Sequence, residues 1–234
     1  QTDLLWFGGI GTYIKDAGEN DADVGDRAND AIRVHARDVR AKVIGEGANL
    51  GLTQKGRIAY ALHGGRCNSD AIDNSAGVNS SDVEVNIKIA LANAMRENRL
   101  TRPKRNTLLA AMTDEVADLV LRNNYLQTLA ISIAEADGVS GVGELNRVMG
   151  NLESRGLLNR KVEYLPDDLA VAERVATGHA LTRPEMGVLL SYAKLVLFDE
   201  IVASSLPDDP ATIWRARARC CNAGPCAARA SPCR

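Results

Sequence analysis

Two glycine-rich segments could bring backbone close to a bound molecule. Residues 8–12 (Gly-Gly-Ile-Gly-Thr) follow the apolar run at 4–7, and residues 45–49 (Gly-Glu-Gly-Ala-Asn) follow the shorter run at 42–44. Glycine has no Cβ, so the backbone at these positions can approach a ligand closely. Ligands of open α/β sheets bind at the carboxyl ends of the strands, where both segments fall. Each segment taken alone is also typical of a tight turn between a strand and a loop.

Neither segment is the phosphate-binding turn of a dinucleotide fold. A G-x-G-x-x-G fingerprint that starts at Gly9 needs glycine or alanine at position 14, where the chain has Ile14. The same fingerprint started at Gly45 meets Leu50 at its last position. We therefore expect the first phosphate-binding turn to lie outside this sequence.

The histidines and cysteines are not arranged for metal binding or nucleophilic catalysis. No histidine lies at metal or triad spacing, and a surface or helix-end position is expected for each: His35, His63 and His179. Four of the five cysteines crowd the last fifteen residues without paired C-x2-C steps. The sequence therefore predicts no metal site. A basic group at 33–40 is expected to be the solvated face of a helix: Arg33, Arg37 and Arg40.

The apolar pattern indicates two kinds of structure in succession. Strand-like runs at 4–7 and 42–44 alternate with helical stretches, one around 28–35 and one capped by Thr53 with Ile58, Ala61 and Leu62 inward. This alternation is typical of a doubly wound sheet. The predicted fold class is α/β (a partial Rossmann-like dinucleotide-binding domain, residues 1–90) followed by a mainly α-helical domain (residues 91–209).

The helical part is predicted from apolar residues that recur every three or four positions from Ser81 onward. Its last strong helix opens on Thr182-Arg183-Pro184-Glu185, a capping box with proline in the first turn. The buried face of this helix is expected to carry Met186, Leu189, Leu190, Ala193, Val196 and Leu197.

Composition excludes several classes of function. A net charge of −2 gives no electrostatic case for nucleic acid, and no run approaches the roughly 18 apolar residues that would span a membrane. A single cysteine in the first two hundred residues suggests a reducing cytoplasm. All acidic residues lie at or before Asp209, and residues 210–234 are expected to be disordered or read out of frame. The chain opens directly on a strand-like segment, so we expect an interior start.

Two longer blocks resemble glutamate dehydrogenases. Residues 44–53 (I-G-E-G-A-N-L-G-L-T) are similar to the E-G-A-N-x-P-x-T segment of these enzymes, and residues 74–84 (N-S-A-G-V-N-S-S-D-V-E) to their N-A-G-G-V-x-V-S-Y-x-E. Blocks at 3–13, 24–31 and 51–57 look like the large, multi-domain NAD-specific enzymes of bacteria. The resemblance implies oxidation of L-glutamate to 2-oxoglutarate and ammonia with NAD, by an enzyme of which this chain is a piece of the C-terminal half.

The resemblance also implies which residues approach NAD. Asn49 would lie near the nicotinamide, where an amide can donate and accept hydrogen bonds at once; the alternative is a side chain that ties down its own loop. Glu46 has the alternative of accepting hydrogen bonds inside the fold. The full cofactor-binding set is Gly8, Gly9, Ile10, Gly11, Thr12, Glu46, Gly47, Ala48 and Asn49.

For the substrate, the resemblance implies three residues. Ser81 would hold the distal carboxylate of glutamate at the start of a helix, with an ordinary N-cap, served by Ser80 or Ser81, as the alternative. Val78 would line the methylene chain and Gly77 would permit the turn. The catalytic lysine and aspartate of the family lie upstream and no residue here matches them, so we expect no catalytic residue in this chain and no activity from it alone.

Two other functions remain open at this stage. A related amino-acid dehydrogenase would differ in the pocket around the side chain of its substrate. A non-catalytic regulatory or assembly module of the same large enzyme would use the long helical half. In either case the full-length enzyme is expected to be a cytoplasmic homo-oligomer.

Overall fold

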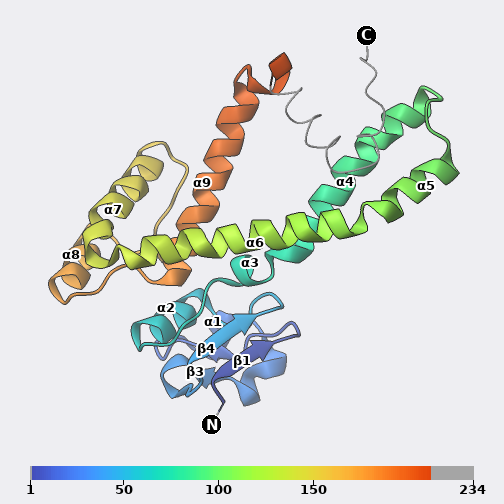
Figure 1. Ribbon diagram of the computed structural model, residues 1–234. Helices are drawn as coiled ribbons and strands as arrows, with labels where there is room; N and C mark the ends of the chain where they lie inside the picture. The colour runs from blue at the N-terminus through green and yellow to red at the C-terminus, as the bar shows by residue number, and fades with distance from the viewer. Residues whose placement is uncertain (1, 212–234) are drawn as a thin grey trace. The chain divides into compact units, whose positions relative to one another are not determined.

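The computed structural model describes residues 2–211, and this part is mostly helical (Figure 1). Its strands are β1 (Leu4–Phe7), β2 (Ile14–Lys15), β3 (Val34–His35) and β4 (Val43–Glu46). The expected strands at 4–7 and 42–44 and the mainly helical remainder are confirmed. The prediction of a disordered or out-of-frame tail falls, from residue 212 on, outside the described residues.

The α-helices are numbered in chain order, and the 3-10 segments are numbered separately. The α-helices are α1 (Asp21–Val24), α2 (Gln54–Leu62), α3 (Asp70–Asp73), α4 (Ser75–Arg96), α5 (Arg102–Ala111), α6 (Thr113–Ala136), α7 (Gly138–Ser154), α8 (Asp168–Ala176) and α9 (Arg183–Ala203). The 3-10 segments are η1 (Arg27–Ile32), η2 (Ala36–Asp38) and η3 (Leu206–Asp208). The described residues form two compact units: the first holds 2–78 and 123–192, the second 79–122 and 193–211.

The strands of the first unit form two parallel pairs. β1 pairs with β4, in a register that runs from Leu4 opposite Val43 to Phe7 opposite Glu46. β2 pairs with β3, and Ile14 of β2 also bridges to Leu52. Within the described residues each sheet has two strands, so the continuous doubly wound sheet that the sequence suggested is not seen.

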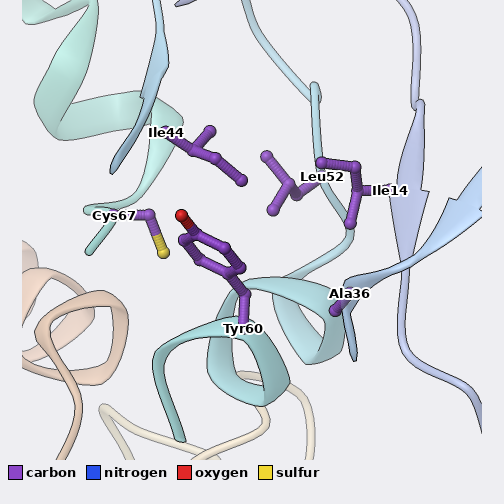
Figure 2. Close-up of a cluster of buried hydrophobic side chains, with 6 residues drawn as sticks. All are labelled: Ile14, Ala36, Ile44, Leu52, Tyr60 and Cys67. Atoms are coloured by element: carbon purple, nitrogen blue, oxygen red, sulfur yellow. The ribbon is translucent and has the colours of Figure 1, made fainter. Parts of the chain in front are cut away.

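A small apolar core fixes the α/β part of the first unit (Figure 2). Six buried residues from both strand pairs, η2, α2 and the segments before and after α2 make it up: Ile14, Ala36, Ile44, Leu52, Tyr60 and Cys67. Leu52 is fully buried, and the Tyr60 hydroxyl donates a hydrogen bond of 2.7 Å to the carbonyl oxygen of Ala41. Aliphatic side chains therefore close this core around one satisfied polar group.

The prediction for α2 is right about its start and partly wrong about its buried face. The Thr53 hydroxyl accepts a hydrogen bond from the Gly56 N–H at 2.9 Å, which confirms the N-cap. Ile58 is buried as expected, but Leu62 is 40% exposed and Arg57 takes a buried position. An apolar count cannot find this arginine, because a paired carboxylate is what allows its burial.

The segment around residues 27–38 also differs from the expectation. It forms the 3-10 segments η1 and η2 in place of the expected helical stretch, and Ile32 is 61% exposed. The Arg33 side chain is fully buried and binds the carboxylates of Asp21 at 2.7 Å and Asp30 at 2.6 Å. The solvated basic face that the sequence indicated is thus wrong for Arg33, because two carboxylates compensate its charge.

One half of the capping box predicted for α9 is confirmed, the bond from the Thr182 backbone to the Glu185 carboxylate, while the Thr182 hydroxyl donates to the same carboxylate at 2.7 Å. The Thr182 N–H donates to Glu185 Oε2 at 2.7 Å, and Arg174 Nη1 lies 2.8 Å from the same oxygen. Met186 and Leu189 are buried as predicted, whereas Leu197 is 57% exposed. The predicted buried face therefore holds in the first turns only. The second half of the helix and the segment after it expose several apolar side chains: Leu195, Leu197, Phe198, Ile201, Val202 and Leu206.

The start of α4 was predicted wrongly. The helix begins at Ser75, six residues before the expected start at Ser81. The hydroxyl of Ser75 donates to the carbonyl oxygen of Ile72 at 3.0 Å and accepts from Gln127 Nε2 at 2.8 Å, so it ties the helix start to α3 and α6. Among residues 2–211, no helix combines the length and the apolar character needed to cross a membrane.

Truncation of Leu52 should measure the contribution of the small core. Leu52→Ala is expected to lower the free energy of unfolding by about 2–5 kcal/mol, because it leaves a cavity among fully buried side chains. The measurement is urea unfolding followed by circular dichroism. Leu62→Ala on α2 is the matched control. It should lower the free energy of unfolding by less than about 1 kcal/mol, since the side chain that it truncates is already partly exposed. Equal losses for the two variants would contradict this core.

Candidate functional site

The two glycine-rich loops begin side by side at the carboxyl ends of β1 and β4. Phe7 and Glu46 are opposite each other in the parallel register, and the Ala48 N–H donates to the Phe7 carbonyl oxygen at 3.1 Å. Gly8 and Gly9 are exposed, and a Cβ added to either would meet nothing within 4 Å. The structure thus places open, glycine-lined backbone where ligands of parallel sheets bind.

Trp6 covers the glycines of the second loop. A Cβ built on Gly45 would lie 2.5 Å from Trp6 Cε3, and one built on Gly47 would lie 2.5 Å from Trp6 Cζ2. Only glycine allows this close approach of the indole to the β4 backbone. Trp6 is nevertheless 58% exposed, so its other side is accessible beside the loops.

The end of the first loop, Gly11 and Thr12, is buried and used by the fold. The Thr12 N–H donates to Asp26 Oδ2 at 2.8 Å, and its carbonyl oxygen accepts from Arg33 Nε at 2.8 Å. The Thr12 hydrogen bond, together with one from Asn29, lowers the pKa of the Asp26 carboxyl. The Thr12 N–H is thus not available to a cofactor, and the residue is buried, in contrast to Gly8, Gly9 and Ile10, which are exposed.

Glu46 forms a buried ion pair with Arg57. Arg57 Nε lies 2.7 Å from Glu46 Oε2, and Arg57 Nη2 lies 2.9 Å from Oε1, which also accepts the Leu52 N–H at 3.1 Å. Burial raises the pKa of the Glu46 carboxyl, against the opposing effect of the Arg57 hydrogen bonds and charge. The Glu46 side chain has no exposed surface, so it acts as the internal acceptor that was the alternative to a cofactor ligand.

The helical turn α3 holds the ends of the second loop. Asp73 Oδ2 accepts the Glu46 N–H at 2.9 Å, and Asp70 Oδ2 accepts the Leu50 N–H at 2.9 Å. Burial raises the pKa of the Asp73 carboxyl above its ordinary value, while a hydrogen bond from Asn68 opposes the rise. Two carboxylates one helical turn apart therefore bracket residues 47–49.

Asn49 is exposed at the tip of this loop and is oriented by Asn74. Asn74 Nδ2 donates to Asn49 Oδ1 at 2.7 Å. Among the described residues, no protein acceptor receives a hydrogen bond from Asn49 Nδ2, so this group can donate to a ligand. These two residues are 25 positions apart in the sequence, and their bond joins the two blocks that resemble glutamate dehydrogenases.

The sequence analysis missed the residues that support the loop. Asp70, Asp73 and Arg57 received no role, and Asn74 appeared only as the first residue of the second family-like block. Nothing in the apolar pattern points to them, because each acts through a hydrogen bond to a residue distant in sequence. The length of the second block was the one signal that could have drawn attention to Asn74.

The three expected substrate residues lie on α4. Gly77 and Val78 are exposed in the first turn of the helix and belong to the first unit, and Val78 is 66% exposed. Ser81 is exposed and belongs to the second unit. It lies within the helix, so the N-cap alternative for Ser80 or Ser81 is wrong, and the helix dipole gives no support to anion binding there.

The chain matches two families of known proteins. The model of the family described as bacterial NAD-glutamate dehydrogenase, catalytic domain, matches residues 1–134. A second model, for the glutamate dehydrogenase C-terminal family, matches residues 178–217.

Three curated relatives are named NAD-specific glutamate dehydrogenase. The protein of Pseudomonas aeruginosa is 52% identical over 207 residues, which is 88% of this chain. That of Halomonas elongata is 50% identical over 215 residues, 92% of the chain, and that of Mycobacterium tuberculosis 48% over 206 residues, 88% of the chain. The chain spans 13% of the length of each of these relatives.

Removal of the Arg57 charge should destabilise the protein in a pH-dependent way. Arg57→Met leaves the buried Glu46 carboxylate without its partner, at an expected cost of about 3–5 kcal/mol in the free energy of unfolding. Burial raises the pKa of Glu46 and Arg57 opposes this rise, so in Arg57→Met the folded-state pKa should rise further and the folded variant should favour the protonated form more than the wild type does. The cost should therefore shrink as the pH falls towards about 4 and grow as the pH rises through the folded-state pKa.

This deficit is measured by urea unfolding at several pH values. Arg37→Met, at an exposed arginine of η2, is the matched control and should change the free energy of unfolding by less than about 0.5 kcal/mol at each pH. A deficit in Arg57→Met that is independent of pH would contradict the unpaired carboxylate as its cause.

Cys67 should be inert to thiol reagents in the folded protein. The side chain is 3% exposed, and burial raises its pKa to about 12. With the other four cysteines replaced by serine, the reaction with a disulfide reagent at pH 8 should be at least about a hundredfold slower than in urea, because the thiolate is the reacting form. Equal rates in the folded and unfolded protein would show that Cys67 is accessible.

Proposed function

The chain belongs to the bacterial NAD-glutamate dehydrogenase family, and we propose that it forms one wall of the active site of an enzyme that oxidises L-glutamate to 2-oxoglutarate and ammonia. The observation that carries the proposal is the hydrogen bond between Asn49 and Asn74. It unites the two family-like blocks at the carboxyl end of β4, beside the open glycines of the first loop.

NAD is the proposed cofactor, and the exposed part of the site suits it. Gly8 and Gly9 leave room for a molecule against their backbone. The Nδ2 group of Asn49 can donate to a carboxamide oxygen, since Asn74 occupies its Oδ1. When bound, NAD supplies the hydride acceptor, and the protein contributes position and the exclusion of water.

The roles of the loop residues follow from their exposure. We propose that Gly8, Gly9, Ile10, Gly47 and Ala48 line the cofactor through their backbone and that Asn49 holds the nicotinamide end. Glu46 would not contact the cofactor itself. It would fix the base of the loop through its ion pair with Arg57. The lysine and aspartate that handle protons in the family would come from another part of a longer protein.

The substrate side is proposed on α4. Ser81 presents an exposed hydroxyl that can donate to the distal carboxylate of glutamate, and Val78 an exposed apolar surface for the methylene chain. The position of Gly77 is itself open, because a Cβ added there would meet nothing within 4 Å. A substrate with an acidic side chain suits this hydroxyl better than leucine or phenylalanine would.

The finer description of the architecture is also a proposal. The parallel pair β1–β4, with ligand-facing loops after both strands, supports a partial Rossmann-like domain in residues 1–90. Residues 91–209 would then form the helical domain. We further propose that the full-length enzyme is a cytoplasmic homo-oligomer, to be checked by analytical ultracentrifugation of that protein.

Glutamate-dependent reduction of NAD tests the function. The full-length protein encoded by the gene of this chain should reduce NAD when L-glutamate is added, and the 234-residue chain alone should not. If neither sample is active with glutamate but the full-length protein is active with another amino acid, that amino acid and not glutamate is the substrate. Activity of this chain alone would show that it contains a catalytic base.

The role of Ser81 is tested separately in the full-length enzyme. Ser81→Ala should raise the KM for glutamate by roughly ten- to a hundredfold, if a charge-assisted hydrogen bond worth about 1.5–3 kcal/mol is lost. The neighbouring Ser80→Ala is the matched control and should leave the KM within about twofold. An unchanged KM in Ser81→Ala would remove this residue from the site.

A further inference from the structure

We propose that Asp70 is a positioning residue for the cofactor: it holds the Asn49 loop in a backbone conformation that the loop would not keep unaided. This inference rests on the proposed NAD site. Asp70 touches no predicted ligand position itself. Its carboxylate lies on α3 and acts on the residue that follows Asn49 in the chain.

The loop contains an unfavourable backbone conformation beside its functional side chain. Leu50 has a φ of 63°, in the left-handed region that residues with a Cβ rarely adopt. Its side chain is 57% exposed, so burial of the leucine does not compensate for this conformation. Such residues persist where their surroundings fix them, and they cluster at ligand sites.

Asp70 supplies the interaction that fixes Leu50. Its Oδ2 accepts the Leu50 N–H at 2.9 Å and also lies 3.2 Å from Arg57 Nη2. Its Oδ1 accepts the Ala71 N–H at 2.8 Å. Only a carboxylate can accept from all three donors, because an amide in its place would turn one N–H₂ group towards a donor.

Arg57 connects this contact to the buried base of the loop. The same guanidinium binds both oxygens of Glu46, the last residue of β4. Residues 46 and 50 are thus held by one network, Glu46 through its side chain and Leu50 through its backbone. Asn49 lies between these two anchors, so its amide can keep one orientation towards the nicotinamide.

The test uses the full-length enzyme and titration with NADH. Asp70→Ala should raise the Kd for NADH about tenfold and leave the KM for glutamate within about twofold, because the Asn49 loop loses its geometry while the substrate residues on α4 keep theirs. Asp38→Ala, at an exposed carboxylate of η2, is the matched control and should leave both constants unchanged.

A second substitution separates positioning from general stability. Asparagine tolerates positive φ better than leucine, so Leu50→Asn should reduce the dependence of the loop on Asp70. The double variant Asp70→Ala with Leu50→Asn is expected to recover NADH binding to within about threefold of the wild type. Equal losses in NADH and glutamate constants, with no rescue by Leu50→Asn, would overturn the positioning role.

The remaining outcomes are equally decisive. If Asp70→Ala does not fold, Asp70→Asn takes its place, and failure of both to fold would make Asp70 a structural residue and overturn the proposal. If the wild type binds NADH and Asp70→Ala binds it with the same Kd, this inference is overturned and the proposed function is left intact. Absence of NADH binding by the wild type would overturn both.

Discussion

The buried ion pair between Glu46 and Arg57 is the constraint on which the α/β part depends. Two opposite charges can be buried together only when their hydrogen-bonding groups are satisfied. Here the guanidinium binds both carboxylate oxygens. This requirement fixes α2 against the end of β4 and draws the Leu52 N–H onto the same carboxylate. The apolar core then closes around Leu52, so polar and apolar packing specify one geometry.

The same constraint determines what the surface can do. The base of the second loop is fixed, so Asn49 at its tip can be exposed and still keep one position. The carboxylates of α3 hold both ends of the loop. The first loop gains its position from the parallel register of β1 and β4 and leaves only glycines and Ile10 exposed. A rigid support beneath an exposed donor is the arrangement that a cofactor site needs, since position and exclusion of water are what the protein contributes.

Sequence reasoning located local features and missed distant ones. The strands at 4–7 and 42–44, the Thr53 cap and the contact between Thr182 and Glu185 were all predictable, because each is signalled by residue types within a few positions. Arg57 and Arg33 were not, since their burial depends on carboxylates at a distance, and an apolar pattern treats every arginine as solvated. The start of α4 was misplaced because Ser75 is secured by groups on α3 and α6. The family-like blocks pointed to Asn49, but only the structure joined it to Asn74.

Amide hydrogen exchange in the full-length protein, with and without NADH, tests the central claim most directly. If the loop after β4 forms the nicotinamide side of the site, saturation with NADH should slow exchange in a peptide that covers residues 46–53, and α7 should exchange at the same rate in both samples. Unchanged exchange at 46–53, in a protein shown to bind NADH, would place the cofactor elsewhere and contradict the account.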